Sequence, residues 1–312
     1  MKKVISIVFI SFFCSLGLLN AQKIWGNPMG QYVYNPAGAS TNDIGEISVN
    51  YYRNYMSATN SPKVISLMGA SPFANNTMGA GFRFCADNAG VLKNLTAEAT
   101  FVYKVQIARS SRLSFGLSAT YNQMALDKGL MNPQHPDDPI LTAASDAGSW
   151  FDMNFGVSIY QTNKYYVGLA MYNLLSQRTN WLMEENLFVN RSARLASLCG
   201  MYTFDIHQGD FKIELSGVAQ TYIPQEKYSF SAVSYDLSAR FILKKMFWLG
   251  SGYSNDMAKL LAGFYIQRFT IGYAGGFSTG DLKNLTNTMP RHEIFLRVEF
   301  ETSKASRKAK TE

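Results

Sequence analysis

The clearest evidence for the fold of this protein lies in the sequence LSFGLSATYN, residues 113–122. Its apolar residues stand at every second position from Leu113 to Tyr121, and the positions between them hold serine, glycine, threonine and asparagine. Successive side chains of a β-strand point to opposite faces, so this alternation predicts a strand with one apolar and one polar face. A helix would mix the two kinds of residue on each of its faces.

The same period of two recurs along the chain, for example in residues 152–159, 211–216 and 293–300. Segments of about ten residues have the length that a tilted strand needs to cross the hydrocarbon layer of a membrane. We therefore predict about 14 strands, an even number as in single-chain bacterial barrels. They lie near residues 44–55, 62–71, 78–87, 95–107, 112–126, 150–161, 165–174, 193–206, 211–222, 228–243, 247–254, 259–267, 270–277 and 292–300.

The connections between these strands alternate in length. The three longest, residues 127–149, 175–192 and 278–291, all fall at one end of the predicted barrel. Transmembrane barrels have long loops outside the cell and short turns in the periplasm, whereas a soluble β-sandwich has no reason to obey this rule. The short connections, which we assign to the periplasm, are residues 72–77, 108–111, 161–164, 207–210, 244–246 and 267–268.

The composition also favours a barrel wall over a soluble domain. Hydrophobic residues make up 47% of the 312 residues and charged residues only 16%, while the mean hydropathy is -0.09. A soluble domain carries about a quarter charged residues, and the chain after residue 21 has no apolar run near the ~20 residues of a membrane helix. The predicted fold class is all-β, a transmembrane antiparallel outer-membrane β-barrel formed by residues 22–300.

Residues 1–21 predict a secretory signal peptide. Lys2 and Lys3 precede an apolar run, residues 4–19, which ends before a small residue, Ala21. This arrangement is typical of a cleaved leader, and the alternative, a membrane helix, would need a longer run. Cleavage would leave the barrel and a basic periplasmic tail, residues 301–312, and we expect the mature protein to be integral to the cell outer membrane.

The cysteines do not indicate a disulfide scaffold. Cys14 would leave with the leader, and the bulky Phe12 and Phe13 before it argue against a lipoprotein signal. Cys85 and Cys199 lie in strand-like segments and are interpreted as free thiols, with one disulfide bridge as the alternative.

The sequence offers little for catalysis. His135, His207 and His292 lie on separate segments, and no nucleophile elbow, zinc-ligand spacing or phosphate loop accompanies them. We predict no enzymatic activity, cofactor, metal or nucleic-acid partner, and keep a lipid hydrolase using His292 as an alternative. Residues 135–139, HPDDP, could hold calcium through their carboxylate oxygens. Two acidic residues supply too few ligands, so we favour a rigid polar surface loop.

Several charged residues fall on the polar faces of predicted strands and would line a lumen. They lie either along a water-filled path or in a paired network, and pairing is favoured because an unpaired buried charge is costly. These candidate lumen charges are Arg83, Lys212, Glu214, Arg240, Arg297 and Glu299.

The predicted periplasmic end is basic, and a face of this sign could meet an acidic partner or the cell wall, with a solvated surface as the alternative. Its cations are Arg109, Arg112, Lys164, Lys244, Lys245 and Arg268 in the turns, and Lys304, Arg307, Lys308 and Lys310 in the tail.

A series of short motifs resembles the PorP/SprF family in order and over essentially the whole mature chain. They are YNPAG (34–38), YRNY (52–55), SPK (61–63), DNAG (87–90), LSFGL (113–117), YVGL (166–169) with Leu174-Leu175, and HEI (292–294). Three features depart from the family pattern: Tyr55 replaces a tryptophan, residues 273–276 read YAGG where a Tyr-Asp pair is usual, and Phe300 is not the terminal aromatic that commonly directs barrel insertion.

The resemblance implies a non-enzymatic outer-membrane barrel of the type IX secretion and gliding machinery of Bacteroidetes. It implies as partners periplasmic ring lipoproteins, a large secreted surface protein, or both, in addition to outer-membrane lipid. The motif residues Asn35, Pro36, Arg53 and His292 are interpreted as structural: Pro36 would fix a turn at the barrel entry, and Arg53 would pair within the wall. The alternative function is an outer-membrane channel or hydrophobic-solute transporter.

Overall fold

The computed structural model describes residues 24, 26, 29–55, 61–130, 147–179, 190–206, 210–223, 233–255, 257–279 and 291–301. Fourteen strands close into one antiparallel barrel in which each strand pairs with its neighbour in the chain, except that β7 pairs with β10 and β1 with β16. The barrel strands are β1 (Gly45–Asn54), β2 (Lys63–Phe73), β3 (Met78–Ala89), β4 (Leu92–Gln106), β5 (Arg112–Leu126), β6 (Ala147–Gln161), β7 (Tyr165–Tyr172), β10 (Arg194–Asp205), β11 (Phe211–Ile223), β12 (Ser234–Leu243), β13 (Phe247–Ser254), β14 (Met257–Ile266), β15 (Phe269–Ser278) and β16 (Arg291–Phe300).

The predicted fold class and number of strands are confirmed, and most strand ends fall within three residues of the prediction. Part of one predicted strand, residues 228–232, lies outside the described residues, as do the leader, the HPDDP loop, His135, His207 and residues 302–312. The sequence analysis missed a small separate sheet of β8 (Arg178–Thr179) and β9 (Asn190–Arg191). Strands of two residues are too short to show a period of two.

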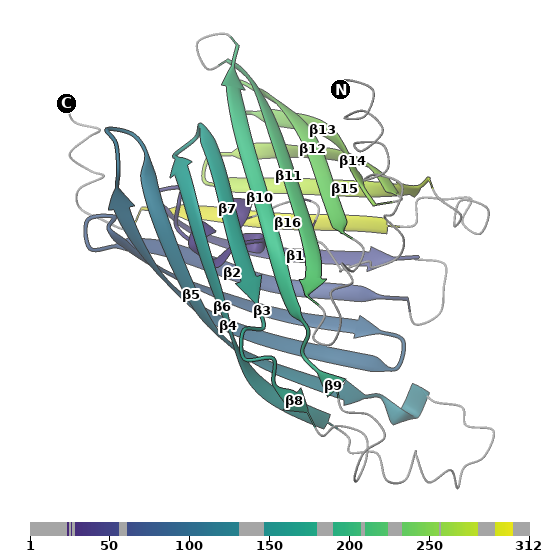
Figure 1. Cartoon of the computed structure of the whole chain (residues 1–312). Coiled ribbons are helices and arrows are strands. Elements are labelled where there is room, and N and C mark those ends of the chain that lie inside the picture. The colour runs from purple at the N-terminus through teal and green to yellow at the C-terminus, as the bar shows by residue number, and fades with distance from the viewer. Residues whose placement is uncertain are drawn as a thin grey trace, which may run out of the picture.

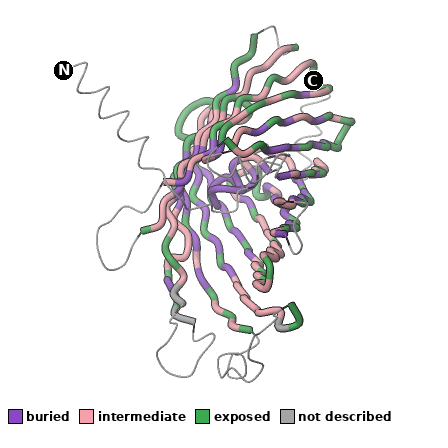
Figure 2. The backbone as a smooth tube through the Cα atoms, turned by 90° about the vertical axis from the view of Figure 1, so that its right-hand side faces the viewer, coloured by how far each residue is buried: buried purple, intermediate pink, exposed green. Residues whose placement is uncertain are grey.

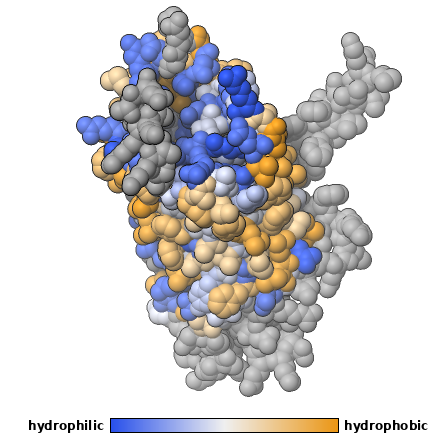
Figure 3. Space-filling view, turned by 90° about the vertical axis from the view of Figure 1, so that its left-hand side faces the viewer, coloured by the Kyte–Doolittle hydropathy of each residue, from blue (hydrophilic) through white to orange (hydrophobic). Residues whose placement is uncertain are grey.

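The barrel faces follow the alternation that predicted them. On β1, Ile47, Val49 and Tyr51 point outward and are exposed, whereas Ser48 and Asn50 point inward and are buried. Figure 3 shows hydrophobic residues across the middle of one side of the barrel and hydrophilic residues gathered towards its upper end. Closure pairs the backbone of every strand, which is what a wall in hydrocarbon requires.

The two ends of the barrel differ. The short-turn end holds the start of β1, the end of β16 and six connections of two to five residues, whereas the long-connection end holds the connections that follow β5, β7 and β15. The predicted grouping of the long connections is thus confirmed. The wall is also uneven in height, because β4, β5 and β6 each have 15 residues while β13 has 8 (Figure 1).

Two 3-10 helices precede β1: η1 (Gly30–Val33) and η2 (Pro36–Gly38). A third, η3 (Lys128–Leu130), follows β5. In the part of the chain that the structure describes, no helix is long and apolar enough to cross a membrane.

Candidate functional site

The chain before β1 folds back inside the barrel and occupies its lumen. Residues 29–44, here called the lumen segment, carry η1 and η2, and Met29, Asn35, Ala37 and Ser40 have almost no exposed surface. Figure 2 shows the buried residues concentrated in this segment and on the strands around it. The segment is the candidate functional site, because it decides whether the barrel is open or closed.

Asn35 and Pro36 fix the turn at the centre of the lumen segment. The Asn35 side chain caps η2 by accepting a hydrogen bond from the Ala37 amide (2.8 Å), and Pro36 begins the helix. The Asn35 amide nitrogen also donates to the carbonyls of Val157 and Leu169 at 3.2 Å each. This turn lies inside the lumen against β6 and β7 rather than at the barrel entry, where the motif interpretation expected Pro36.

Inward-facing glycines make room for this turn. A Cβ atom built on Gly116, Gly156 or Gly168 would lie less than 3.0 Å from atoms of Asn35, Pro36 or Ala37, a distance that real Cβ atoms essentially never show. Gly116 and Gly156 face each other in register. From the sequence, Gly116 and Gly156 were placed on polar faces, and Gly168 was quoted only within the motif YVGL. The recurrence of glycine at inward positions of neighbouring strands was a signal that the sequence held.

Polar side chains of the wall hold the rest of the lumen segment. Ser114 donates to the Ala37 carbonyl (2.9 Å), and the buried Lys104 ammonium donates to the Ser40 carbonyl (2.8 Å). The Tyr32 hydroxyl is 2.9 Å from the hydroxyl of Thr100. Burial raises the pKa of the Tyr32 phenol above its ordinary value, so this side chain remains a neutral hydrogen-bonding group.

The barrel strands supply most of the filling on the opposite side of the lumen, where Gly26 of the preceding chain lies against the Phe295 ring. The buried Trp248 of β13 and Phe295 of β16 stack with their ring centroids 6.3 Å apart, and Leu261 and Ala274 complete the cluster. On this side, too, glycines accommodate the filling groups: a Cβ on Gly272 would collide with the Phe295 ring.

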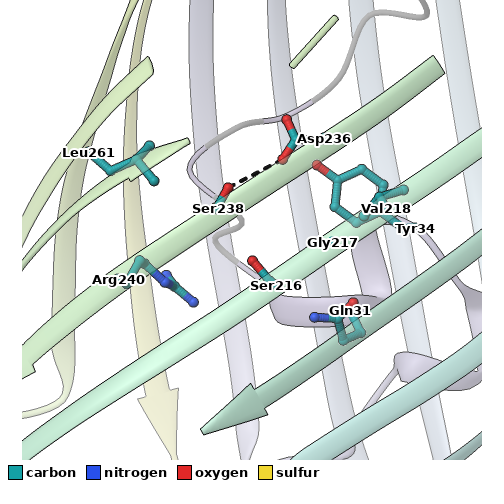
Figure 4. A pocket seen from close by; sticks show the side chains of 9 residues that line it. All are labelled: Gln31, Tyr34, Ser216, Gly217, Val218, Asp236, Ser238, Arg240 and Leu261. Atoms are coloured by element: carbon teal, nitrogen blue, oxygen red, sulfur yellow. Dashed lines mark hydrogen bonds between the residues drawn. The ribbon is translucent and has the colours of Figure 1, made fainter. Parts of the chain in front are cut away.

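A small gap separates the lumen segment from β11, β12 and β14. Its volume is about 10 Å³, close to the space of one water molecule. Figure 4 shows Gln31 and Tyr34 of the lumen segment beside residues of these strands. The gap is lined by Gln31, Tyr34, Ser216, Gly217, Val218, Asp236, Ser238, Arg240 and Leu261.

All six candidate lumen charges lie in ion pairs. Arg83 pairs with Glu98 at 2.6 Å, and Arg240 pairs with Glu214 directly across the β11–β12 register. The remaining pairs are Lys212 with Asp205 (2.9 Å) and Arg297 with both Glu299 (2.9 Å) and Glu46 (3.7 Å). In a lumen that is largely filled, pairing offsets the loss of hydration that burial imposes on each charge.

The structure adds two buried pairs that sequence reasoning missed. Lys259 donates to both carboxylate oxygens of Asp236 (2.6 and 2.7 Å), and Arg291 pairs with Glu293 at 3.0 Å. Lys259 and Asp236 are distant in sequence, so no local pattern connects them. Arg291 is the first residue of β16, where too few residues alternate to assign its side chain to a face.

Arg53 and His292 lie apart from the lumen. They face each other in register between β1 and β16, at the long-connection end. The Arg53 guanidinium donates to the Ser61 hydroxyl (2.6 Å), and the His292 ring is 2.6 Å from the hydroxyl of Tyr273. His292 therefore has a phenol as its hydrogen-bond partner, the hydrogen-bonded ring that a structural role implies.

Neither metal-site nor disulfide geometry occurs in the described ranges. No group of three His, Cys, Asp or Glu side chains within them could hold a metal ion. Cys85 and Cys199 are free, which confirms the prediction of free thiols.

Asp152 organises the long-connection end. This buried carboxylate of β6 accepts hydrogen bonds from the Leu175 amide (2.9 Å) and the Ser192 hydroxyl (2.8 Å). It thereby ties the start and the end of the connection between β7 and β10 to the tallest part of the wall.

Comparison with known proteins identifies relatives of this chain at the family level. The family model described as "Type IX secretion system membrane protein PorP/SprF" matches residues 29–298. This match takes in the lumen segment and almost the whole barrel. Among curated proteins nothing matches the sequence.

Two solved structures show a similar fold. The Pseudomonas putida toluene transporter TodX has a TM-score of 0.52 at 8% identity, with 91% of this chain and 97% of that chain covered. The CymD monoaromatic hydrocarbon channel has a TM-score of 0.51 at 12% identity, with 92% and 96% covered. At such identities the likeness concerns the barrel fold alone.

Proposed function

Because the chain belongs to the PorP/SprF family of type IX secretion system membrane proteins, we propose that it is a closed outer-membrane barrel that supports the secretion or cell-surface attachment of a partner protein. In this role the barrel is a docking body in the membrane and a component of the secretion and gliding machinery, and it performs no catalysis. The proposal includes cleavage of the leader after Ala21.

The filled lumen is the observation that carries this proposal. The lumen segment occupies the β3–β7 side, Trp248 and Phe295 occupy the β12–β16 side, and the gap beside Gln31 holds about one water. A conduit for solutes would need a continuous path, whereas an anchor or docking body needs a rigid wall and two accessible ends. The hydrogen bonds between the lumen segment and the wall, and the ion pairs between strands of the wall, suit the second design.

The two ends suit two kinds of partner. With the short turns in the periplasm, the short-turn end would meet periplasmic ring lipoproteins of the machinery. The long-connection end would meet a large secreted surface protein. The extra height of β4, β5 and β6, and the fixing of a long connection by Asp152, support a preformed surface at that end.

Gene deletion with surface proteomics tests the proposal. We expect a partner protein to disappear from the surface of the deletion strain and to return when the wild-type gene is restored. A mutant gene carrying Gly156→Leu, whose new side chain collides with Asn35, should not restore it. Unchanged display and secretion in the deletion strain would contradict the proposal.

Conductance separates this role from the alternative, an outer-membrane channel or hydrophobic-solute transporter. The purified barrel in liposomes should show no steady conductance and no uptake of toluene, because the lumen segment blocks it. Steady conductance or uptake by the wild-type barrel would favour the transporter. Copurification of periplasmic partners with a non-conducting barrel would favour the docking role.

A further inference from the structure

Three exposed cations gather on two adjacent turns of the short-turn end. Lys244 and Lys245 form the turn between β12 and β13, and Arg268 lies in the turn between β14 and β15. The Tyr265 amide donates to the Met246 carbonyl (2.8 Å), which brings the two turns side by side. Among the described residues none of the three cations has an ion-pair partner, whereas Arg112 and Lys212 at the same end are paired.

The two lysines occupy backbone positions that do not favour lysine. Their φ angles are 46° and 51°, and the Met246 amide donates to the Leu243 carbonyl (2.8 Å), so Lys244 and Lys245 are the two central residues of a β-turn and both lie in the left-handed region. Asn-Gly is the preferred sequence for such a turn, because an L side chain is strained in the left-handed region. Of the other positive-φ positions in the short turns, Asn75, Asn76 and Asn163 hold asparagine, whereas Ala74 and Gln267 do not. Turn geometry thus does not call for lysine at either position, and the charge of both side chains is available to a ligand.

Apolar side chains adjoin the cations on the outer face. Met246 is 62% exposed, Ile266 54% and Phe269 46%. Each directly precedes or follows a cationic turn in sequence. The cations thus stand at the boundary of the apolar band, which is the depth at which lipid phosphate groups lie beside a membrane protein.

The geometry points to a binding site for anionic lipid: Lys244, Lys245 and Arg268 bind phosphate groups of phospholipids in the periplasmic leaflet, while Met246, Ile266 and Phe269 contact the adjoining acyl chains. The inference rests on the membrane orientation in the proposed function. It adds to that function a lipid contact that holds the barrel at a defined depth. The apolar flank favours lipid over an acidic protein, which would contact the turns without needing hydrophobic residues beside them.

Native mass spectrometry of the purified barrel in detergent, titrated with phosphatidylglycerol or with phosphatidylcholine, tests the site. The test variant is Lys244→Asn/Lys245→Gly/Arg268→Gln, in which the Asn-Gly pair suits the turn and keeps the barrel folded. We expect the wild-type barrel to retain phosphatidylglycerol preferentially. The variant should lose about tenfold or more in apparent affinity, because it removes all three cations of the site. The control Lys63→Gln, which removes an exposed cation at the opposite end, should retain wild-type affinity.

The other outcomes separate the possible ligands. Equal phosphatidylglycerol binding by variant and wild type would overturn the inference. Binding of inorganic phosphate without any preference for phosphatidylglycerol would show a free-anion site and overturn the lipid assignment. Lysine-dependent binding of a polyglutamate peptide, with unchanged lipid binding, would assign the turns to an acidic protein instead. None of these lipid results would contradict the proposed membrane role. Failure of the wild-type barrel to insert into vesicles would contradict it.

Discussion

On the β3–β7 side of the barrel, the lumen is filled by a segment from outside the sheet, which rests on Gly116, Gly156 and Gly168. On the β12–β16 side, the wall fills the lumen with its own Trp248 and Phe295. The glycine side leaves a hollow that only the lumen segment can occupy, so its packing depends on a chain segment that closes no strand pair. On the aromatic side the strands supply the large side chains, and the chain before β1 adds Gly26, whose amide donates to Glu293 beside the Phe295 ring.

This difference indicates how each half responds to change. A side chain added on the glycine side displaces the segment and with it all of its hydrogen bonds. A side chain removed on the aromatic side leaves a cavity, but the segment stays in place. The two responses can be measured separately.

Gly156→Leu should have the largest effect, a loss of more than about 4 kcal/mol in the free energy of unfolding. The new side chain would collide with Asn35, which cannot move without losing its bonds to β6 and β7. Urea unfolding in lipid vesicles measures the change. The matched control is Gly200→Leu, because Gly200 faces outward between Leu198 and Tyr202 and a leucine there meets lipid. Equal losses in the two variants would contradict the idea of a glycine cradle.

Trp248→Ala should lower the free energy of unfolding by about 3 to 4 kcal/mol through the cavity that it leaves. The lumen segment should remain protected from hydrogen exchange, because Asn35 and Ala37 bond to β5, β6 and β7 on the other side. Hydrogen exchange of residues 35–40 measures this protection. If residues 35–40 of the variant lost their protection while its barrel still unfolded at the wild-type rate, the two halves of the barrel would be coupled.

Glu214→Leu should cost about 3 kcal/mol, because it leaves the half-buried Arg240 guanidinium without its carboxylate. The double variant Glu214→Leu/Arg240→Met should recover most of that loss, since an apolar pair can replace a buried ion pair. Equilibrium unfolding of the two single variants and the double variant completes the cycle. No recovery in the double variant would mean that the pair itself contributes net stability.

Asn35→Ala should lower the free energy of unfolding by about 2 kcal/mol, through loss of the η2 cap and of two bonds to the wall. Asn35→Ser keeps an acceptor for the cap but reaches neither wall carbonyl, so an intermediate loss is expected. Wild-type stability of the serine variant would show that the wall bonds contribute nothing.

Tyr273→Phe should have the smallest effect, less than about 1 kcal/mol, because it removes one hydrogen bond to His292 on the outer face. Lipid-hydrolase assays of the same variant and of His292→Ala should show no activity to lose. A measurable hydrolase activity in the wild-type barrel would contradict the non-enzymatic proposal.

Most strands of the wall could be predicted from the sequence, because alternate residues of a strand point to opposite faces. The alternation in residues 113–122 identified β5, and the opposite charges of Glu214 and Arg240 fall on inward positions of neighbouring strands. The lengths of the connections then indicated which of them lie at the same end of the barrel. Each of these inferences needs only local order and the rule that neighbouring strands pair.

The filling of the lumen could not be read in the same way. The motif YNPAG predicted a turn at Pro36, but its place inside the barrel depends on Gly116, Gly156 and Gly168, which come from three different strands. No local pattern tells whether a glycine on a polar face lines water or supports another segment. That distinction arises only when closure of β1 against β16 encloses the space.

Residue order thus predicts the barrel strands, their two faces, the even-numbered wall and six of the inward charges, because period-two burial is a property of each strand. Closure of the barrel places residues 29–44 in the lumen and sets which charges meet there. The physical reason is that a cavity is a property of the closed wall: its shape depends on side chains far apart in the chain, and its occupant is whichever segment fits that shape.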